Sequence, residues 1–146
     1  KFLDAVTIYV VDFAGKKDSA TFKWIDTDGK EFFNTVHMTE IDYVDSITAI
    51  PNDAAFEFFW DGDALVDGEN VVLLIDAVGN ASQLFNETKT GSNSIILSKA
   101  QLEKLPEGDA TLYMDKKHTV DLQEATSAGG TIFSTYRPTN KVVEIQ

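Results

Sequence analysis

The chain of 146 residues contains no cysteine, two histidines and three prolines. The absence of cysteine excludes disulfides, thiolate-bound metals and a cysteine nucleophile together. No apolar run approaches the roughly 18 residues that a membrane-spanning helix requires, so we expect no integral membrane segment. The histidines, His37 and His118, lack the His-x-x-x-His spacing of a helical zinc site. We interpret both as solvated or hydrogen-bonded side chains, with His118 in a loop.

Positive charge is also scarce, because 12 Lys and Arg face 24 Asp and Glu and the formal net charge is −12. Such a field repels phosphate backbones, and no basic cluster offsets it, so we expect no nucleic-acid partner. Binding to an anionic membrane surface is disfavoured for the same reason. The simplest interpretation of the acidic excess is the solvated surface of a soluble protein.

What the chain does contain is a succession of short stretches in which apolar and polar residues alternate, separated by turn residues. This pattern predicts β-strands, over residues 2–13, 20–26, 31–39, 42–50, 54–60, 70–77, 95–97, 109–115, 131–137 and 141–145. Residues 79–94 are polar and predict a long loop, and residues 98–105 predict a short helical turn with Ser98 as N-cap. Many strands without long helices predict a single all-β domain over 1–146, an antiparallel β-sandwich or a barrel.

Two acidic segments are candidates for calcium. Residues 26–29 (Asp-Thr-Asp-Gly) superficially match the start of an EF-hand loop, but the Gly comes two residues early and strands flank it, so we predict a type I′ hairpin turn. The second segment surrounds two Asp-Gly turns and contains Asp61, Asp63, Asp67 and Glu69. Its carboxylates could collect a hard cation, or they could cap the turns. Both interpretations stay open.

The sequence predicts no catalytic, cofactor-binding or metal-binding residue. The Gly-x-Ser-x-Gly elbow of serine hydrolases is absent, and Ser92 belongs to a predicted turn. A Ser-His-Asp triad or a pair of catalytic carboxylates could still form in space. A small secreted hydrolase is therefore an alternative to a noncatalytic domain.

Aromatic residues give the one positive indication of binding. On residues 54–60, alternation predicts Phe56, Phe58 and Trp60 in the core and Phe59 on the opposite face. Phe33 and Tyr136 are further candidates for exposed rings. Exposed rings beside acids and amides suit sugars, whose C–H faces stack on aromatic surfaces. The alternative is a sandwich that is covered on both faces.

Residues 97–114 (LSKAQLEKLPEGDATLYM) carry a Leu-x-x-Leu pair, Pro106 and Gly108 directly before a predicted strand. This resembles the corner before the penultimate core strand of immunoglobulin-like and fibronectin type III domains. The resemblance implies an immunoglobulin-like sandwich with Tyr113 as the corner tyrosine, whose hydroxyl bonds back to the main chain. Residues 60–146 also resemble β-sandwich domains of lipid-anchored cell-envelope proteins from Bacteroides-like bacteria. That resemblance implies an extracytoplasmic location, with an anchor cysteine upstream of Lys1.

Together these observations predict a noncatalytic domain of a cell-envelope or secreted protein, acting in adhesion, assembly or ligand binding. A carbohydrate is the most specific candidate ligand, and a protein at the cell surface is another. A structural spacer domain is a further alternative. The sequence leaves the oligomeric state open.

Overall fold

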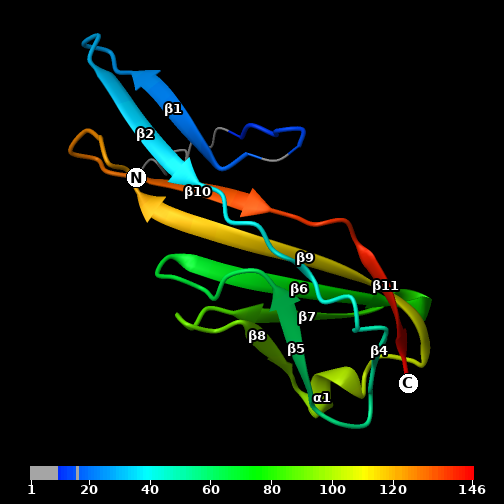
Figure 1. Cartoon of the computed structure of the whole chain (residues 1–146). Helices are drawn as coiled ribbons and strands as arrows, with labels where there is room; N and C mark the ends of the chain where they lie inside the picture. Colours follow the sequence, from blue (N-terminus) through cyan, green and yellow to red (C-terminus); the bar gives the residue numbers. More distant parts are fainter. Residues whose placement is uncertain (1–9, 16) are drawn as a thin grey trace, which may run out of the picture.

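The computed structural model describes residues 10–15 and 17–146. Short strands dominate this part of the chain, as the alternating pattern predicted (Figure 1). The strands are β1 (Ser19–Ile25), β2 (Glu31–His37), β3 (Asp42–Tyr43), β4 (Ala49–Ile50), β5 (Phe56–Asp61), β6 (Glu69–Ala77), β7 (Ala81–Glu87), β8 (Ser94–Leu97), β9 (Gly108–Asp121), β10 (Thr131–Tyr136) and β11 (Lys141–Ile145). One helical turn, α1 (Lys99–Leu102), lies where the sequence predicted it, and a 3-10 turn, η1 (Val78–Asn80), joins β6 to β7.

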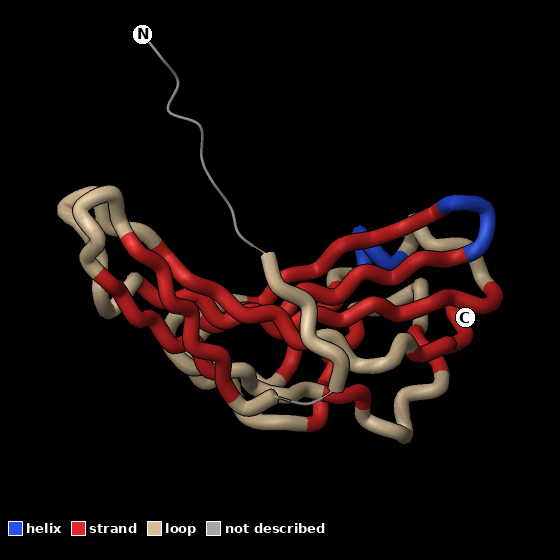
Figure 2. Tube along the Cα trace, turned by 90° about the horizontal axis from the view of Figure 1, so that it is seen from above, coloured by secondary structure: helices blue, strands red, loops and turns tan. Residues whose placement is uncertain are grey.

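Three groups of strands build the fold. A six-stranded sheet has the order β4-β11-β9-β6-β7, with β10 paired to the far half of β9. A three-stranded sheet has the order β3-β5-β8, and within the described residues β1 pairs only with β2. Neighbouring strands are antiparallel except β4 and β11, which are parallel. The large sheet is strongly curved (Figure 2), and the three-stranded sheet lies against its inner face, so the fold is a β-sandwich-like arrangement.

The main core lies between these two sheets. The large sheet contributes alternate residues such as Leu73 on β6 and Leu112 on β9, both fully buried. The smaller sheet contributes Phe58 and Trp60, which face inward as the alternation on β5 predicted. Tyr43 on β3 meets Phe58 edge to face, with ring centroids 6.4 Å apart, and its hydroxyl donates to the main-chain oxygen of Leu112 at 2.8 Å.

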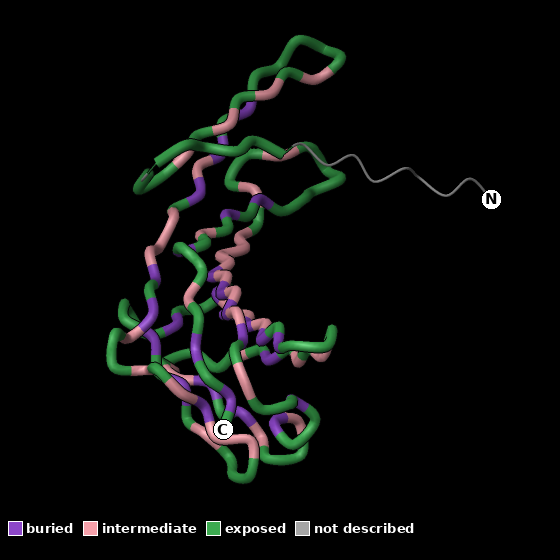
Figure 3. The backbone as a smooth tube through the Cα atoms, turned by 90° about the vertical axis from the view of Figure 1, so that its right-hand side faces the viewer, coloured by how far each residue is buried: buried purple, intermediate pink, exposed green. Residues whose placement is uncertain are grey.

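The β1–β2 hairpin projects beyond this core and is less buried than the main body (Figure 3). Its buried apolar side chains, Phe32 and Val36, lie outside the main core cluster. Trp24 of β1 stacks on Phe32 with ring centroids 4.1 Å apart. Asn34 fastens the hairpin to the body, because its amide donates to the main-chain oxygen of Glu124 and accepts from the Glu124 N–H, both at 2.9 Å.

Several predicted elements need correction. The loop predicted over 79–94 contains strand β7, which pairs along β6 from residue 81 to residue 87. β9 continues to Asp121, so His118 lies in a strand rather than in a loop. Of the strand predicted over 2–13, residues 2–9 lie outside the described part, and residues 10–13 form a connecting segment.

The turn between β1 and β2 is also different from the predicted type I′ turn. Asp28 does not adopt a positive φ, and Gly29 does, at 79°. A two-residue type I′ turn requires both. The Asp26 carboxylate instead accepts hydrogen bonds from the N–H groups of Asp28 and Lys30, each at 2.9 Å. These bonds hold a longer turn and occupy the Asp26 carboxylate locally.

Candidate functional site

The acidic segment that the sequence offered for calcium is divided in the structure. Asp61, Asp63 and Asp67 are exposed, whereas Glu69 is buried at the start of β6. Within residues 10–15 and 17–146, no three side chains of His, Asp or Glu gather where they could hold a metal ion. Glu69, the buried member of the segment, forms an ion pair instead.

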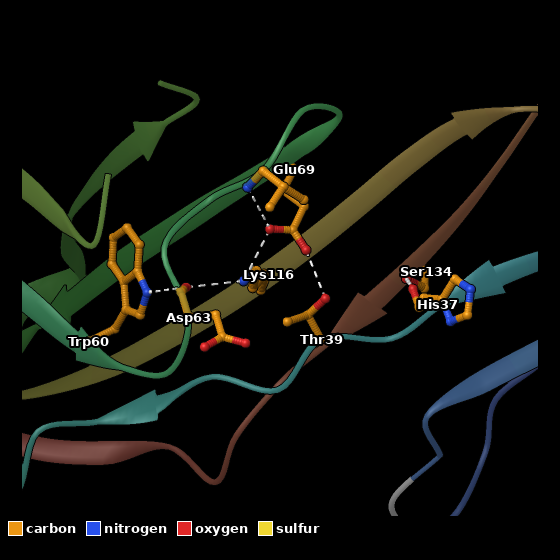
Figure 4. Close-up of polar contacts among 8 residues, drawn as sticks. His37, Thr39, Trp60, Asp63, Glu69, Lys116 and Ser134 are labelled. Carbon is orange, nitrogen blue, oxygen red and sulfur yellow. Dashed lines mark hydrogen bonds and ion pairs between the residues drawn. The ribbon is translucent and has the colours of Figure 1, made fainter. Parts of the chain in front are cut away.

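The partner in this ion pair is Lys116 on the neighbouring strand β9. The Lys116 Nζ lies 3.1 Å from Glu69 Oε2, and the two side chains are 1% and 2% exposed. The other Glu69 oxygen accepts from the Thr39 hydroxyl at 2.7 Å, and Oε2 also accepts from the Val66 N–H at 3.0 Å. Lys116 donates in addition to the main-chain oxygen of Asp63, at 3.3 Å (Figure 4). Both charges are therefore paired and hydrogen-bonded, as burial requires.

The pKa of Glu69 is set by opposing effects. Burial raises it, but hydrogen bonds from the Val66 N–H, the Thr39 hydroxyl and Lys116, together with the Lys116 charge, outweigh burial and leave the pKa below its usual value. A general acid would need the opposite shift. The lowered pKa keeps Glu69 charged, so the pair joins β6 to β9 as a buried ion pair.

The sequence contains a signal for this buried pair. Alternation along β9 places Lys116 on the same face as Leu112 and Met114, both fully buried. Glu69 likewise precedes the buried residues 71, 73 and 75 of β6 at the same period. A lysine and a glutamate in phase with two adjacent apolar faces indicate a buried pair, provided that the strand pairing is known.

The two histidines line the same hollow. His37 is exposed at the end of β2, and both histidines line an open hollow of about 420 Å³ with Thr35, Val36, Val120 and Gln123. Ser134 lies opposite His118 on the neighbouring strand, yet its hydroxyl donates to the main-chain oxygen of His37 at 2.7 Å. The Nδ1 atom of His118 is buried and has no hydrogen-bond partner in the described part of the chain.

The aromatic residues that the sequence singled out are separated in the structure. Phe59 on β5 and Phe33 on β2 are 43% and 46% exposed, as the alternation predicted, but they belong to different sheets. The Lys23 ammonium lies 5.6 Å from the Phe33 ring centroid. Tyr136 is half-buried and packs against the main core. These three rings do not form one binding surface.

A different surface gathers an aromatic ring with apolar and charged side chains. On the outer face of the six-stranded sheet, Leu84, Leu74 and Tyr113 are register neighbours across β7, β6 and β9. Directly opposite residues share a face of the sheet, so these side chains form one row. Val72 lies two residues before Leu74 on the same face of β6, and Asp115 is its register neighbour on β9.

We call the seven residues of this surface the outer-face hollow. They line an open hollow of about 320 Å³, and they are Val72, Leu74, Asp76, Leu84, Tyr113, Asp115 and Arg137. The Arg137 guanidinium donates two hydrogen bonds to the Asp115 carboxylate, each 2.6 Å long. These bonds raise the pKa of Arg137 and hold both groups in one plane at the border of the hollow. Leu84 is 60% exposed, so the apolar floor is open to solvent.

The sequence did not predict the outer-face hollow. Its residues come from β6, β7, β9 and the segment after β10, and β7 lies within the predicted loop. The resemblance assigned Tyr113 to the corner, but its side chain lines this hollow, and the hydroxyl that bonds to the main chain of β9 belongs to Tyr43.

The described residues form no helix with the length and hydrophobicity of a membrane span. Comparisons of the chain with protein-family models, with curated proteins and with solved structures find no match in any of the three.

Proposed function

We propose that the chain is a noncatalytic binding domain of a cell-envelope or secreted protein and that it holds a carbohydrate in the outer-face hollow. The observation that carries this proposal is the combination of one tyrosine ring, an aliphatic floor and a fixed carboxylate–guanidinium pair around about 320 Å³. This volume is at the lower end of the range for small-molecule sites.

Each part of the hollow suits a sugar ring. The Tyr113 ring and the apolar side chains of Leu74 and Val72 offer a surface for the C–H face of a pyranose. Asp115 and Arg137 offer acceptors and donors in a fixed plane, and hydrogen bonds to charged groups are the stronger class. Asp76 adds a further acceptor at the border. No proton-transfer chemistry is needed for this role.

We also propose that the fold is immunoglobulin-like and that the domain is extracytoplasmic. β5 pairs with β8 in one sheet, and β6, β9 and β11 occupy the other in the order β6-β9-β11. Strands B–E and C–F–G of immunoglobulin-like domains are arranged in this way. The α1 turn then corresponds to the corner before strand F. This arrangement supports an immunoglobulin-like domain, and the extracytoplasmic location follows from the resemblance to cell-envelope β-sandwich domains.

A glycan array with the full chain, followed by calorimetry on the sugars that bind, tests the proposal. We expect Tyr113→Ala to weaken binding at least about tenfold, a change of roughly 1.4 kcal/mol. Arg137→Gln should also weaken it, and Tyr113→Phe should retain most of it because the ring stays. Phe59→Ala is the matched control, since it removes an exposed ring from the other sheet.

Three results would contradict the proposal in different ways. Binding that is lost equally in Phe59→Ala would place the site elsewhere. Cleavage of the bound sugar, followed by mass spectrometry, would favour the hydrolase alternative. A chain that binds none of the arrayed sugars would favour the spacer.

A further inference from the structure

The β1–β2 hairpin is a two-stranded ribbon in a fold of larger sheets. Each strand has seven residues, and β1 has β2 as its one strand partner within the described part of the chain. Isolated two-stranded ribbons are at best marginally stable, and a third strand or a covering element is usually needed. Whether a further strand can add to this ribbon depends on whether the main-chain groups at its two edges are already hydrogen-bonded.

The edge formed by β2 is closed by side chains. The Phe33 N–H donates to the Glu124 carboxylate at 2.6 Å, and the Thr35 N–H donates to the Gln123 side-chain oxygen at 2.7 Å. These two side chains take the place of a neighbouring strand, and the Asn34–Glu124 contact fixes them in position.

The edge formed by β1 is open. In an antiparallel pair, residues opposite each other direct their main-chain groups either toward each other or both away. Phe33 and Thr35 point away from β1, so their partners Lys23 and Thr21 also direct their N–H and C=O groups outward. Within the described residues, these N–H groups have no hydrogen-bond partner. An unpaired edge of this kind is a template for an added strand.

The same chain carries an apolar segment shortly before this ribbon in the sequence. Val10, Val11 and Phe13 are 71%, 53% and 44% exposed. They end the apolar stretch over residues 2–13, for which the sequence predicts a strand. Five residues separate this segment from β1, yet residues 10–13 of the chain do not pair with the β1 edge.

We propose that the open edge of β1 accepts the apolar segment ending at residues 10–13 from a second copy of the chain, as an added β-strand. Main-chain hydrogen bonds to Thr21 and Lys23 would supply affinity, as in other cases of strand addition. One face of the added strand would extend the apolar layer of Phe22 and Trp24, which are only half-buried. Reciprocal exchange closes a dimer, and one-way addition builds a chain of molecules.

Two kinds of variant of the full chain test the β1 edge and the apolar segment independently. Thr21→Pro removes an outward N–H and leaves the ladder to β2 intact, because proline lacks the donor. Lys23→Pro is a second variant of the same kind, and Thr21→Val is the matched control that keeps the N–H. Val10→Asp combined with Val11→Asp disables the segment at two exposed positions, so the monomer should fold as before.

Sedimentation and light scattering over a roughly hundredfold range of concentration give the readout, because association follows mass action. The unmodified chain and Thr21→Val should associate as concentration rises, whereas the proline variants and the double Asp variant should stay monomeric with unchanged thermal unfolding. Mixing a folded proline variant with the double Asp variant should restore one heterodimer, since each supplies what the other lacks.

Two outcomes would overturn the proposal. One is an unmodified chain that stays monomeric over the whole range, and the other is association that survives both kinds of variant. Sugar binding at the outer-face hollow is measured separately and does not depend on this edge. Failure of one proposal is therefore distinguishable from failure of the other.

Discussion

Removal of one charge from the Glu69–Lys116 pair tests how the two sheet strands are held together. In Lys116→Met, the Glu69 carboxylate stays buried with the Thr39 hydroxyl and the Val66 N–H but without its cation. Breaking a buried pair in this way lowers the free energy of unfolding by about 3–5 kcal/mol. For a domain of this size, that corresponds to a fall in melting temperature of roughly 10–15 °C.

The double variant Glu69→Gln with Lys116→Met is the informative comparison. It removes both charges and keeps a side-chain oxygen that can accept from Thr39 or the Val66 N–H. We expect it to recover at least half of the loss, because the unpaired buried carboxylate causes most of it. Urea unfolding, followed by circular dichroism, measures all three variants on the same scale.

The pH dependence of the free energy of unfolding is an independent test of whether the charged Glu69 stabilises the fold. The pKa of Glu69 is lowered from 4.5 on folding, so its carboxylate stabilises the fold fully above that value. This contribution is lost as the pH falls through the folded pKa. The difference in stability between the unmodified chain and Glu69→Gln should therefore shrink on acidification. A Lys116→Met variant of unchanged stability, or a double variant less stable than Lys116→Met, would refute the reasoning.

Two further predictions concern the backbone and the core. Gly68 and Gly29 both have φ of 79°, but an added Cβ at Gly68 would lie 2.4 Å from a main-chain oxygen of β9, whereas at Gly29 it meets open space. Gly29→Ala should therefore destabilise the fold by about 1 kcal/mol from the positive φ alone, and Gly68→Ala by clearly more; equal melting temperatures would contradict this account. Tyr43→Phe should lower the free energy of unfolding by about 0.5–1.5 kcal/mol, because it removes the hydroxyl bond to β9. Burial raises the pKa of Tyr43 to about 12, so spectrophotometric titration should show a late-ionising component that Tyr43→Phe removes; a late component that persists in Tyr43→Phe would contradict this assignment.

The sequence predicted most strands because one side of each is buried. β6 alternates between buried and half-buried positions along nearly its whole length, and its residues 71–75 form a continuous apolar run, which is typical of a buried strand. β7 has Phe85 as its one buried side chain and mostly polar residues around it. It pairs as an outer strand of the six-stranded sheet, where the main chain rather than the side chains supplies the contacts. A polar outer strand and a polar loop look alike in sequence.

The candidate site was less accessible to sequence reasoning for a related reason. Tyr113 and Arg137 lie 24 positions apart, and their approach depends on the pairing of β9 with β10. Nothing in either local segment encodes that pairing. Exposed rings could be predicted one strand at a time, as for Phe33 and Phe59, but not whether they gather on one surface.

The length of β9 has a consequence for how the chain finds its native strand register. A one-residue slip along β6 would turn Asp115 inward and Met114 outward, so the apolar pattern alone opposes it. A two-residue slip keeps every side chain on its own face of the sheet, so the apolar pattern does not oppose it. It would, however, move Lys116 by about 6.8 Å along its neighbour, too far to keep both the Glu69 carboxylate and the Asp63 main-chain oxygen. The buried pair thus distinguishes between alignments that hydrophobicity treats as equal.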